Sequence, residues 1–188
     1  MSAQENHAMV RTVASTQSEM TEIILPNDTN LLGNLLGGRL MHFIDLTGAV
    51  AAFRHSRTYV VTAAMDHIDF IQPVRLGDLV TLKASVNRAF TSSMEVGVRV
   101  EAENTRTGAV THVASAYIVY VAVDEHGRVQ KVPQLKPETP NEIRRYEDAL
   151  RRREHRERES ARRVEAKLAV AARAEAQEKP QQSGSSIH

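Results

Sequence analysis

Five segments of the chain are apolar runs of the kind that form β-strands. The clearest example is the segment 94–102, where Met, Val and Ala occupy every second position and Glu, Gly and Arg lie between them. Turn-forming clusters such as Pro26-Asn27-Asp28 and Gly77-Asp78 lie next to the strand-like runs. The other runs occupy residues 19–25, 59–71, 79–86 and 110–123. The pattern predicts one early strand and, later in the chain, four consecutive strands.

One segment has the length and the continuous apolar character of a buried helix. It runs from about Arg39 to His55, it is apolar on nearly every side, and a glycine-rich stretch over residues 33–38 precedes it. A strand, a buried helix and then consecutive strands indicate an α+β domain with an antiparallel sheet. The order excludes a doubly wound parallel sheet, because parallel neighbours need a crossover connection between them.

A second helix is predicted near the C-terminus. Thr139-Pro140-Asn141-Glu142 forms a capping box with proline at the first helical position, and the segment continues to about Gln177. Its first turns carry a narrow apolar stripe that can dock on the domain, after which Arg and Glu dominate and we expect the helix to project into solvent. We divide the chain into a flexible leader (1–17), an α+β domain (18–138), a charged helix (139–178) and a disordered tail (179–188).

Composition narrows the classes of function. The 188 residues include no cysteine, which excludes disulfides, thiolate zinc sites and a cysteine nucleophile and is compatible with a reducing compartment. No apolar run approaches the roughly 20 residues of a membrane-spanning helix. The residues up to Met20 contain no apolar segment of the kind found in signal peptides. We therefore expect a cytoplasmic protein that has no membrane partner.

The net charge of +1 hides an asymmetry between body and tail. Residues 1–138 carry 12 Lys or Arg and 14 Asp or Glu, whereas residues 139–188 carry 12 and 9. Nucleic-acid binding would thus depend on the tail alone. Because Glu is intermixed with Arg in that tail, and because no helix-turn-helix is visible, we expect no nucleic-acid partner.

Asp45 is the most informative polar residue, because it lies in the middle of the apolar helix. An unpaired carboxylate buried there would cost on the order of several kcal/mol, so a helix that keeps one is a candidate functional site. The alternative is a polar residue that is satisfied at a subunit interface. His42 precedes Asp45 by about one turn and could pair with it, or it could be an ordinary surface histidine.

Other motifs carry weaker signals. Gly33 and Gly38 have the spacing of a phosphate-binding loop, but Arg39 follows where that loop requires Lys. The glycines still leave room for a ligand at a helix start, where free N–H groups favour negative charge. His67 and Asp69 share a strand face without a third ligand, so no metal site is expected. The absence of G-x-S-x-G excludes a serine nucleophile of the α/β-hydrolase kind.

The combination of a glycine-rich loop, a buried helix with one aspartate and an antiparallel sheet resembles the hotdog fold, a sheet wrapped around one long helix. Over residues 18–150 the chain is also similar to the cytosolic acyl-CoA hydrolases, including the brain-type acyl-CoA thioesterases. The similarity rests on Pro26-Asn27-Asp28-Thr29-Asn30, Gly33-Asn34-Leu35-Leu36-Gly37-Gly38, Met41-His42-Phe43-Ile44-Asp45, Val61-Thr62-Ala63, Ile68-Asp69-Phe70-Ile71-Gln72-Pro73, Ser92-Ser93-Met94-Glu95-Val96 and Asn104-Thr105-Arg106-Thr107-Gly108.

The resemblance implies hydrolysis of an acyl-CoA thioester to a fatty acid and free CoA. It assigns Asp45 as the catalytic carboxylate, acting as general base or nucleophile, and Asn30 as a residue that reaches the site from the partner subunit. Gly37 and Gly38 would place a backbone N–H where the thioester oxyanion forms. His42 lies outside the family's set of functional residues.

The resemblance also implies the remaining partners. Arg88, Ser92 and Ser93 resemble the segment of related thioesterases that lies beside the CoA phosphates, and no cofactor is implied because CoA belongs to the substrate. A single hotdog unit implies a homodimer at minimum, with a trimer of dimers as a larger assembly. Two alternatives use the same fold: a non-catalytic acyl-CoA-binding regulator, and a dehydratase that would need His42 beside a carboxylate. The acyl chain length cannot be read from the sequence.

Overall fold

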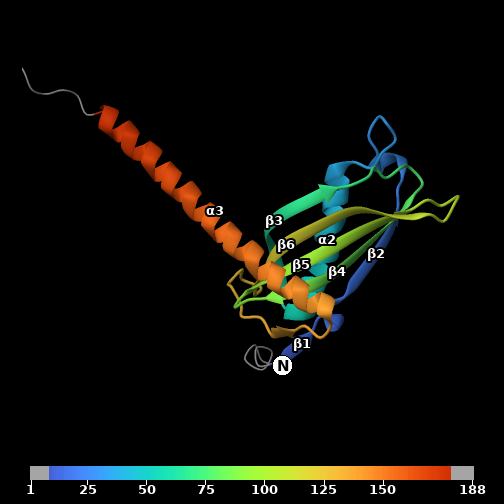
Figure 1. Cartoon of the computed structure of the whole chain (residues 1–188), viewed down its shortest axis with the longest axis horizontal. Coiled ribbons are helices and arrows are strands. Elements are labelled where there is room, and N and C mark those ends of the chain that lie inside the picture. Colours follow the sequence, from blue (N-terminus) through green and yellow to red (C-terminus); the bar gives the residue numbers. More distant parts are fainter. Residues whose placement is uncertain (1–8, 179–188) are drawn as a thin grey trace, which may run out of the picture. The chain divides into compact units, whose positions relative to one another are not determined.

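A five-stranded antiparallel sheet forms the body of the computed structural model, which describes residues 9–178 (Figure 1). The strands follow the order β2-β4-β5-β6-β3. Their bounds are β2 (Ser18–Ile23), β3 (Tyr59–Phe70), β4 (Leu79–Ala89), β5 (Ser93–Glu103) and β6 (Val110–Val123). Every predicted strand is present, with small differences at the ends. In β4, Val80, Leu82 and Val86 are fully buried, whereas Lys83 is exposed.

The helix α2 (Gly37–Ser56) crosses one face of this sheet and contacts β2 to β6 (Figure 1). Leu40, Phe43 and Ile44 of α2 belong to the same buried core as the inward-facing residues of the strands. This arrangement confirms the predicted α+β class and the hotdog architecture, in which one sheet wraps around one long helix. The core therefore fixes where Asp45, one residue after Ile44, meets the sheet.

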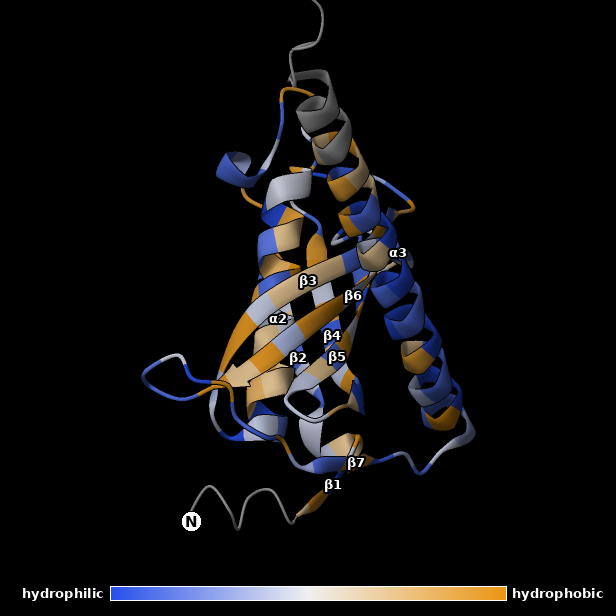
Figure 2. Cartoon of the chain, turned by 90° about the vertical axis from the view of Figure 1, so that its left-hand side faces the viewer, coloured by the Kyte–Doolittle hydropathy of each residue, from blue (hydrophilic) through white to orange (hydrophobic). Residues whose placement is uncertain are grey.

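The prediction that α2 is buried on nearly every side is wrong for the single chain. Met41, Leu46, Val50 and Phe53 are 41–48% exposed, and the apolar residues of α2 can be followed in Figure 2. One sheet can cover only one side of a helix, and within the described residues no second layer lies over the other side. The sequence indicates that this surface is apolar, but it does not indicate what covers it.

The predicted flexible leader is also partly wrong. Val10–Thr12 forms strand β1, which pairs in parallel with β7 (Gln134–Lys136), and Ala14–Thr16 forms the short helix η1. Thr16 is fully buried, and its Oγ1 accepts a hydrogen bond from the backbone N–H of Val86 at 3.0 Å. Such short strands give no periodic signal, so only the fold reveals them. The predicted leader residues 1–8 and the predicted tail 179–188 lie outside the described residues.

The helix α3 (Pro140–Glu178) begins with the predicted capping box. Glu142 Oε2 accepts a hydrogen bond from the N–H of Thr139 at 3.0 Å, and Thr139 Oγ1 accepts one from the N–H of Glu142 at 3.3 Å. The chain divides into two compact units, residues 1–149 and 150–188, so the first turns of α3 belong with the sheet. In the second unit, pairs such as Arg153–Glu157 (2.8 Å) link successive turns. No helix among residues 9–178 is long and apolar enough to cross a membrane.

Candidate active site

Asp45 is half-buried where α2 meets strands β3 and β6. Thr62 of β3 donates a hydrogen bond from Oγ1 to Asp45 Oδ1 at 2.7 Å, and the Tyr120 hydroxyl of β6 lies 3.2 Å from the same oxygen. Thr62 and Tyr120 are paired neighbours in the sheet, which places both side chains on the face that carries α2. Among the described residues, Asp45 Oδ2 accepts no hydrogen bond. One carboxylate oxygen is therefore held, and the other is available to a ligand.

Tyr120 is buried behind the carboxylate. Its side chain is fully inaccessible, and its hydroxyl also donates to the backbone oxygen of Asp45 at 2.8 Å. Burial, together with the negative charge of Asp45, raises the pKa of Tyr120 well above its ordinary value. The hydroxyl thus remains protonated and able to donate at neutral pH.

Asn30 lies in a tight loop, residues 29–35, that precedes α2. Its side-chain Oδ1 accepts hydrogen bonds from the N–H groups of Leu32 at 2.9 Å and Asn34 at 3.2 Å, which shapes the loop. Its Nδ2 donates to no described residue, and no hydrogen bond joins it to Asp45 within the chain. The exposed Asn30 side chain therefore keeps two free donors.

The start of this loop is fixed by Asp28, which is only 7% exposed. Asp28 Oδ1 accepts a hydrogen bond from Arg39 Nε at 2.7 Å, and Oδ2 accepts one from the N–H of Leu25 at 3.1 Å. Because Arg39 lies in the first turn of α2, the ion pair links the loop to the helix. The loop that carries Asn30 is thereby tied to α2 at its start.

Gly37 and Gly38 are the first two residues of α2, which begins slightly before the predicted start at about Arg39. The first N–H groups of an α-helix have no intrahelical acceptor and lie at the positive end of its dipole. A Cβ built at Gly38 would meet no atom within 4 Å, so the space in front of it is open. The helix start can therefore receive a negatively charged oxygen.

A largely apolar cavity of about 390 Å³ adjoins the Asn30 loop and the start of α2. This volume is in the range of small-molecule sites. The cavity brings together Asn30 and Gly37, whereas Asp45 and Gly38 are not among the residues that line it in the single chain. Its lining residues are Asn30, Asn34, Leu35, Gly37, Leu40, Phe70, Ile71, Gln72, Pro73 and Val74.

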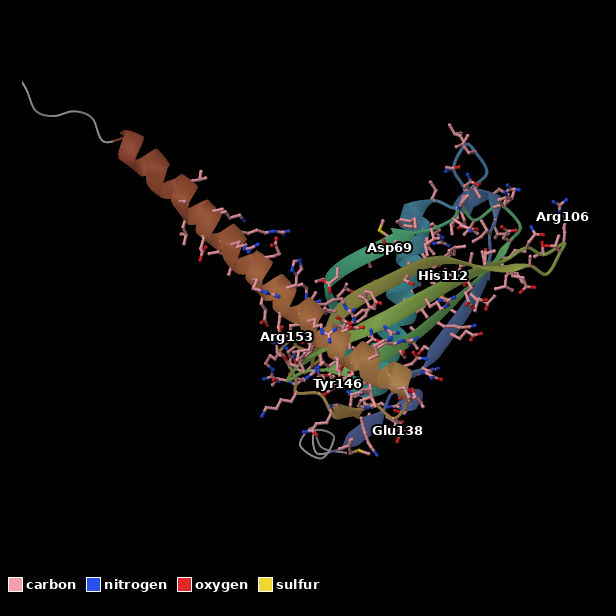
Figure 3. All side chains as sticks on the ribbon, viewed as in Figure 1. Asp69, Arg106, His112, Glu138, Tyr146 and Arg153 are labelled. Carbon is pink, nitrogen blue, oxygen red and sulfur yellow. The ribbon has the colours of Figure 1, made fainter. Side chains whose placement is uncertain are left out.

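Arg88, Ser92 and Ser93 are not brought into contact with Asp45. Arg88 donates from Nη1 to the backbone oxygen of Tyr146 at 3.1 Å, and its guanidinium lies 4.0 Å from the centre of the Tyr146 ring. Tyr146 itself lies near the start of α3 (Figure 3). Ser92 and Ser93 lie at the β4–β5 turn, where their backbone oxygens accept hydrogen bonds. Within the single chain, Arg88 holds the first turns of α3 against β4.

The His42–Asp45 pair is not formed. His42 is exposed, its ring lies 6.2 Å from that of Phe43, and no hydrogen bond joins it to Asp45 among the described residues. The helical spacing permits a pair, but the carboxylate turns instead toward Thr62 and Tyr120. This correction removes the catalytic pair that a dehydratase would need.

Sequence reasoning missed Thr62 and Tyr120 as partners of Asp45. Thr62 lies in the family-like segment Val61-Thr62-Ala63, so its hydroxyl was a signal that could have been used. Tyr120 lies in a strand that is apolar on both faces, where a tyrosine is indistinguishable from a core residue. Only the pairing of β3 with β6 brings the two hydroxyls together.

Comparisons with known proteins bear on this geometry. A family model described as "Thioesterase superfamily" matches residues 32–109. An uncharacterized acyl-CoA thioester hydrolase of Bacillus subtilis, YkhA, is 40% identical over 132 residues, which cover 70% of this chain and 77% of that protein. The structure of an apo-hexameric acyl-CoA thioesterase matches with a TM-score of 0.79 at 38% identity. The match covers 81% of this chain and 98% of that chain.

An acyl-CoA hydrolase of Staphylococcus aureus, solved with butyryl coenzyme A, coenzyme A and coenzyme A disulfide, has a TM-score of 0.77 at 33% identity. The match covers 88% of this chain and 99% of that one. Three further structures of that hydrolase are alanine mutants, one of an asparagine, one of an aspartate and one of a threonine. The aspartate follows the asparagine by 15 residues, and the threonine follows the aspartate by 17. Asn30, Asp45 and Thr62 have the same two spacings.

Proposed function

The chain belongs to the acyl-CoA thioester hydrolases of the thioesterase superfamily, and we propose that it hydrolyses fatty acyl-CoA to a free fatty acid and CoA, with Asp45 as the catalytic residue. The observation that carries the proposal is the Asp45 carboxylate, held at Oδ1 by Thr62 while Oδ2 is free. The matched spacing of Asn30, Asp45 and Thr62 in the Staphylococcus aureus hydrolase supports it.

The free oxygen of Asp45 has two ways to act. As a general base, Oδ2 takes a proton from water while the water oxygen bonds to the thioester carbonyl carbon. As a nucleophile, Oδ2 itself bonds to that carbon, and water then cleaves the resulting anhydride. In both routes the carbon–sulfur bond breaks and the CoA thiolate leaves and is protonated. A thiolate is a good leaving group, so no strong separate acid is needed.

Negative charge on the carbonyl oxygen is stabilised by donors on the other side of the site. We assign this role to the N–H groups at Gly37 and Gly38 and to Nδ2 of Asn30. Asn30 would come from the partner subunit, because it makes no hydrogen bond to Asp45 within one chain. The loop that carries it also presents Leu31 and Leu32, which are 107% and 84% exposed, as expected of a loop that another copy covers.

A homodimer is the smallest assembly that completes such a site. The exposed apolar residues of α2, Met41, Leu46, Val50 and Phe53, offer a surface for a second copy. Strand β3 lies at the edge of the sheet and so can pair with a further strand. The hexameric state of the similar acyl-CoA thioesterase supports a trimer of dimers as the complete assembly.

Arg88, Ser92 and Ser93 remain our proposed contacts for the CoA phosphates. The proposal includes no cofactor, no metal and a cytoplasmic location. Release of free CoA thiol from a panel of acyl-CoAs of graded chain length, followed with a thiol reagent, tests it and establishes the chain length. Binding of acyl-CoA without thiol release would contradict the proposal and favour a non-catalytic acyl-CoA-binding regulator.

A further inference from the structure

The contact between Tyr120 and α2 is unusually close for a side chain from a sheet. The Tyr120 hydroxyl lies 2.8 Å from the backbone oxygen of Asp45 and 3.2 Å from its Oδ1. A phenol has a single proton to donate, so the two oxygens share it in a bifurcated hydrogen bond. Both of these acceptors belong to Asp45. Tyr120 therefore fixes the backbone of Asp45 and the direction of its side chain at once.

This approach is possible because residue 48 is glycine. Gly48 lies about one turn after Asp45 on α2, and a Cβ built on it would be 2.5 Å from the Tyr120 hydroxyl oxygen and 3.2 Å from two ring carbons. Side chains do not tolerate the first of these distances. Glycine is less favourable than alanine in a helix interior, because it loses more backbone conformational freedom on folding. The close approach to Tyr120 gives a physical reason for a residue that the helix itself disfavours.

We propose that Tyr120, seated by Gly48, is a positioning residue that fixes Asp45 so that Oδ2 is presented to the reacting thioester. Thr62 binds Oδ1 from the exposed side, whereas Tyr120 binds it from a fully buried position. The two donors hold the carboxylate between them and leave Oδ2 as its reactive atom. This inference rests on the proposed catalytic role of Asp45.

The test is the change Tyr120→Phe, which removes only the hydroxyl. We expect kcat to fall roughly tenfold while KM for acyl-CoA stays within about twofold, because a carboxylate held by Thr62 alone samples unproductive orientations without altering ground-state binding. The matched control is Tyr117→Phe: Tyr117 is on the same strand but faces the other side of the sheet, where it lines a polar cavity with Arg144 and Arg145. A wild-type kcat in a folded Tyr120→Phe protein would overturn the proposal.

A second variant approaches the same contact from the helix. Gly48→Ala improves helix propensity but displaces the Tyr120 hydroxyl, so kcat should again fall roughly tenfold. In the Tyr120→Phe background the same change should cost much less, because the hydroxyl is already absent. Losses that simply add would contradict the proposal. If one single variant does not fold, the kcat of the other still decides.

The variant Asp45→Asn in the same assay separates the two proposals. If Asp45→Asn retains activity, the proposed catalytic role of Asp45 has failed. If Asp45→Asn is inactive and both Tyr120→Phe and Gly48→Ala match the wild type in kcat, only the positioning role has failed.

Discussion

At the scale of single residues, the proposed chemistry depends on the two oxygens of one carboxylate. Asp45 Oδ1 accepts hydrogen bonds from hydroxyl groups on two neighbouring strands, whereas Oδ2 accepts none from the described residues. Hydrogen bonds to a carboxylate offset part of the free energy lost when it leaves water. They also restrict its rotation, which a reacting group requires.

Replacing Asp45 by asparagine tests the carboxylate with little change in volume. The amide oxygen can still accept from Thr62, so we expect the fold and CoA binding to persist. Thiol release should fall on the order of 10² to 10⁴-fold, because the base or nucleophile is gone. The control is His42→Ala, an exposed position about one turn away, which should keep wild-type turnover. Turnover by Asp45→Asn above a tenth of wild type would refute the assignment.

The Thr62 hydroxyl can be removed while the shape of its side chain is kept. We expect Thr62→Val to lower kcat roughly tenfold, because Oδ1 loses its 2.7 Å hydrogen bond. Thr62→Ser restores the hydroxyl and should recover most of the activity. Steady-state thiol release from both variants gives the comparison. Equal activity of the valine and serine variants would show that the hydroxyl has no role.

At the scale of elements, His55 joins the end of α2 to the segment before β7. Its Nε2 lies 2.9 Å from the Pro133 carbonyl oxygen and donates to it, while Nδ1 is buried without a hydrogen-bond partner among the described residues. Burial lowers the pKa of His55 from its ordinary value of 6.5; the hydrogen bond to Pro133 opposes this effect and the charge of Arg11 adds to it. The folded protein therefore favours neutral His55.

This preference predicts a pH dependence of stability. Below pH 6.5 the unfolded chain binds a proton at His55 more readily than the folded one, so the free energy of unfolding should decrease as the pH falls through this value. Well above pH 6.5, where His55 is neutral in both the folded and the unfolded state, it should contribute no slope. Urea unfolding at pH 7.5 and 5.5 measures the difference, which His55→Gln should reduce and the exposed His126→Gln should not. Equal slopes in wild type and His55→Gln would contradict the assignment.

The helix α3 should matter for stability near its start and little for chemistry beyond it. A chain that ends after Arg153 keeps Tyr146 and the buried Ala149, so we expect wild-type activity per site. A chain that ends after Pro137 loses these contacts and should unfold at a lower temperature. Thermal unfolding and thiol release report the two properties. If the chain that ends after Arg153 folds and assembles but is inactive, residues after Arg153 reach an active site.

At the scale of the whole molecule, the proposed site belongs to two chains. If Asn30 acts on the Asp45 of its partner, a heterodimer of Asn30→Ala and Asp45→Asn chains contains one intact site and one doubly altered site. Co-expression with two different tags should thus recover up to roughly half the activity of a wild-type dimer. Each variant assembled alone should remain nearly inactive. No recovery in heterodimers verified by mass would place both residues in one protomer's site.

The sequence by itself determined the five strands of the main sheet, the two long helices and the candidate catalytic residue. Alternation predicts β5, apolar runs beside turn residues predict β3, β4 and β6, and continuous apolarity predicts α2, because all of these are properties of neighbouring positions. Asp45 was identifiable because a carboxylate in an apolar helix is costly wherever the helix packs. The capping box at Thr139 follows from an equally local rule.

Only the tertiary structure decided which residues surround Asp45 and which apolar surfaces stay uncovered. Thr62 and Tyr120 meet the carboxylate because β3 and β6 pair in one register. This register is a long-range property that cannot be inferred from either strand alone. Arg88 has the positive charge expected of a phosphate-binding residue, yet in the fold its guanidinium stacks on the ring of Tyr146. The exposed and the buried faces of α2 are both apolar, so the sequence does not distinguish them. Hydrophobicity shows that a side chain is more stable away from water, but it does not show which part of the protein covers it.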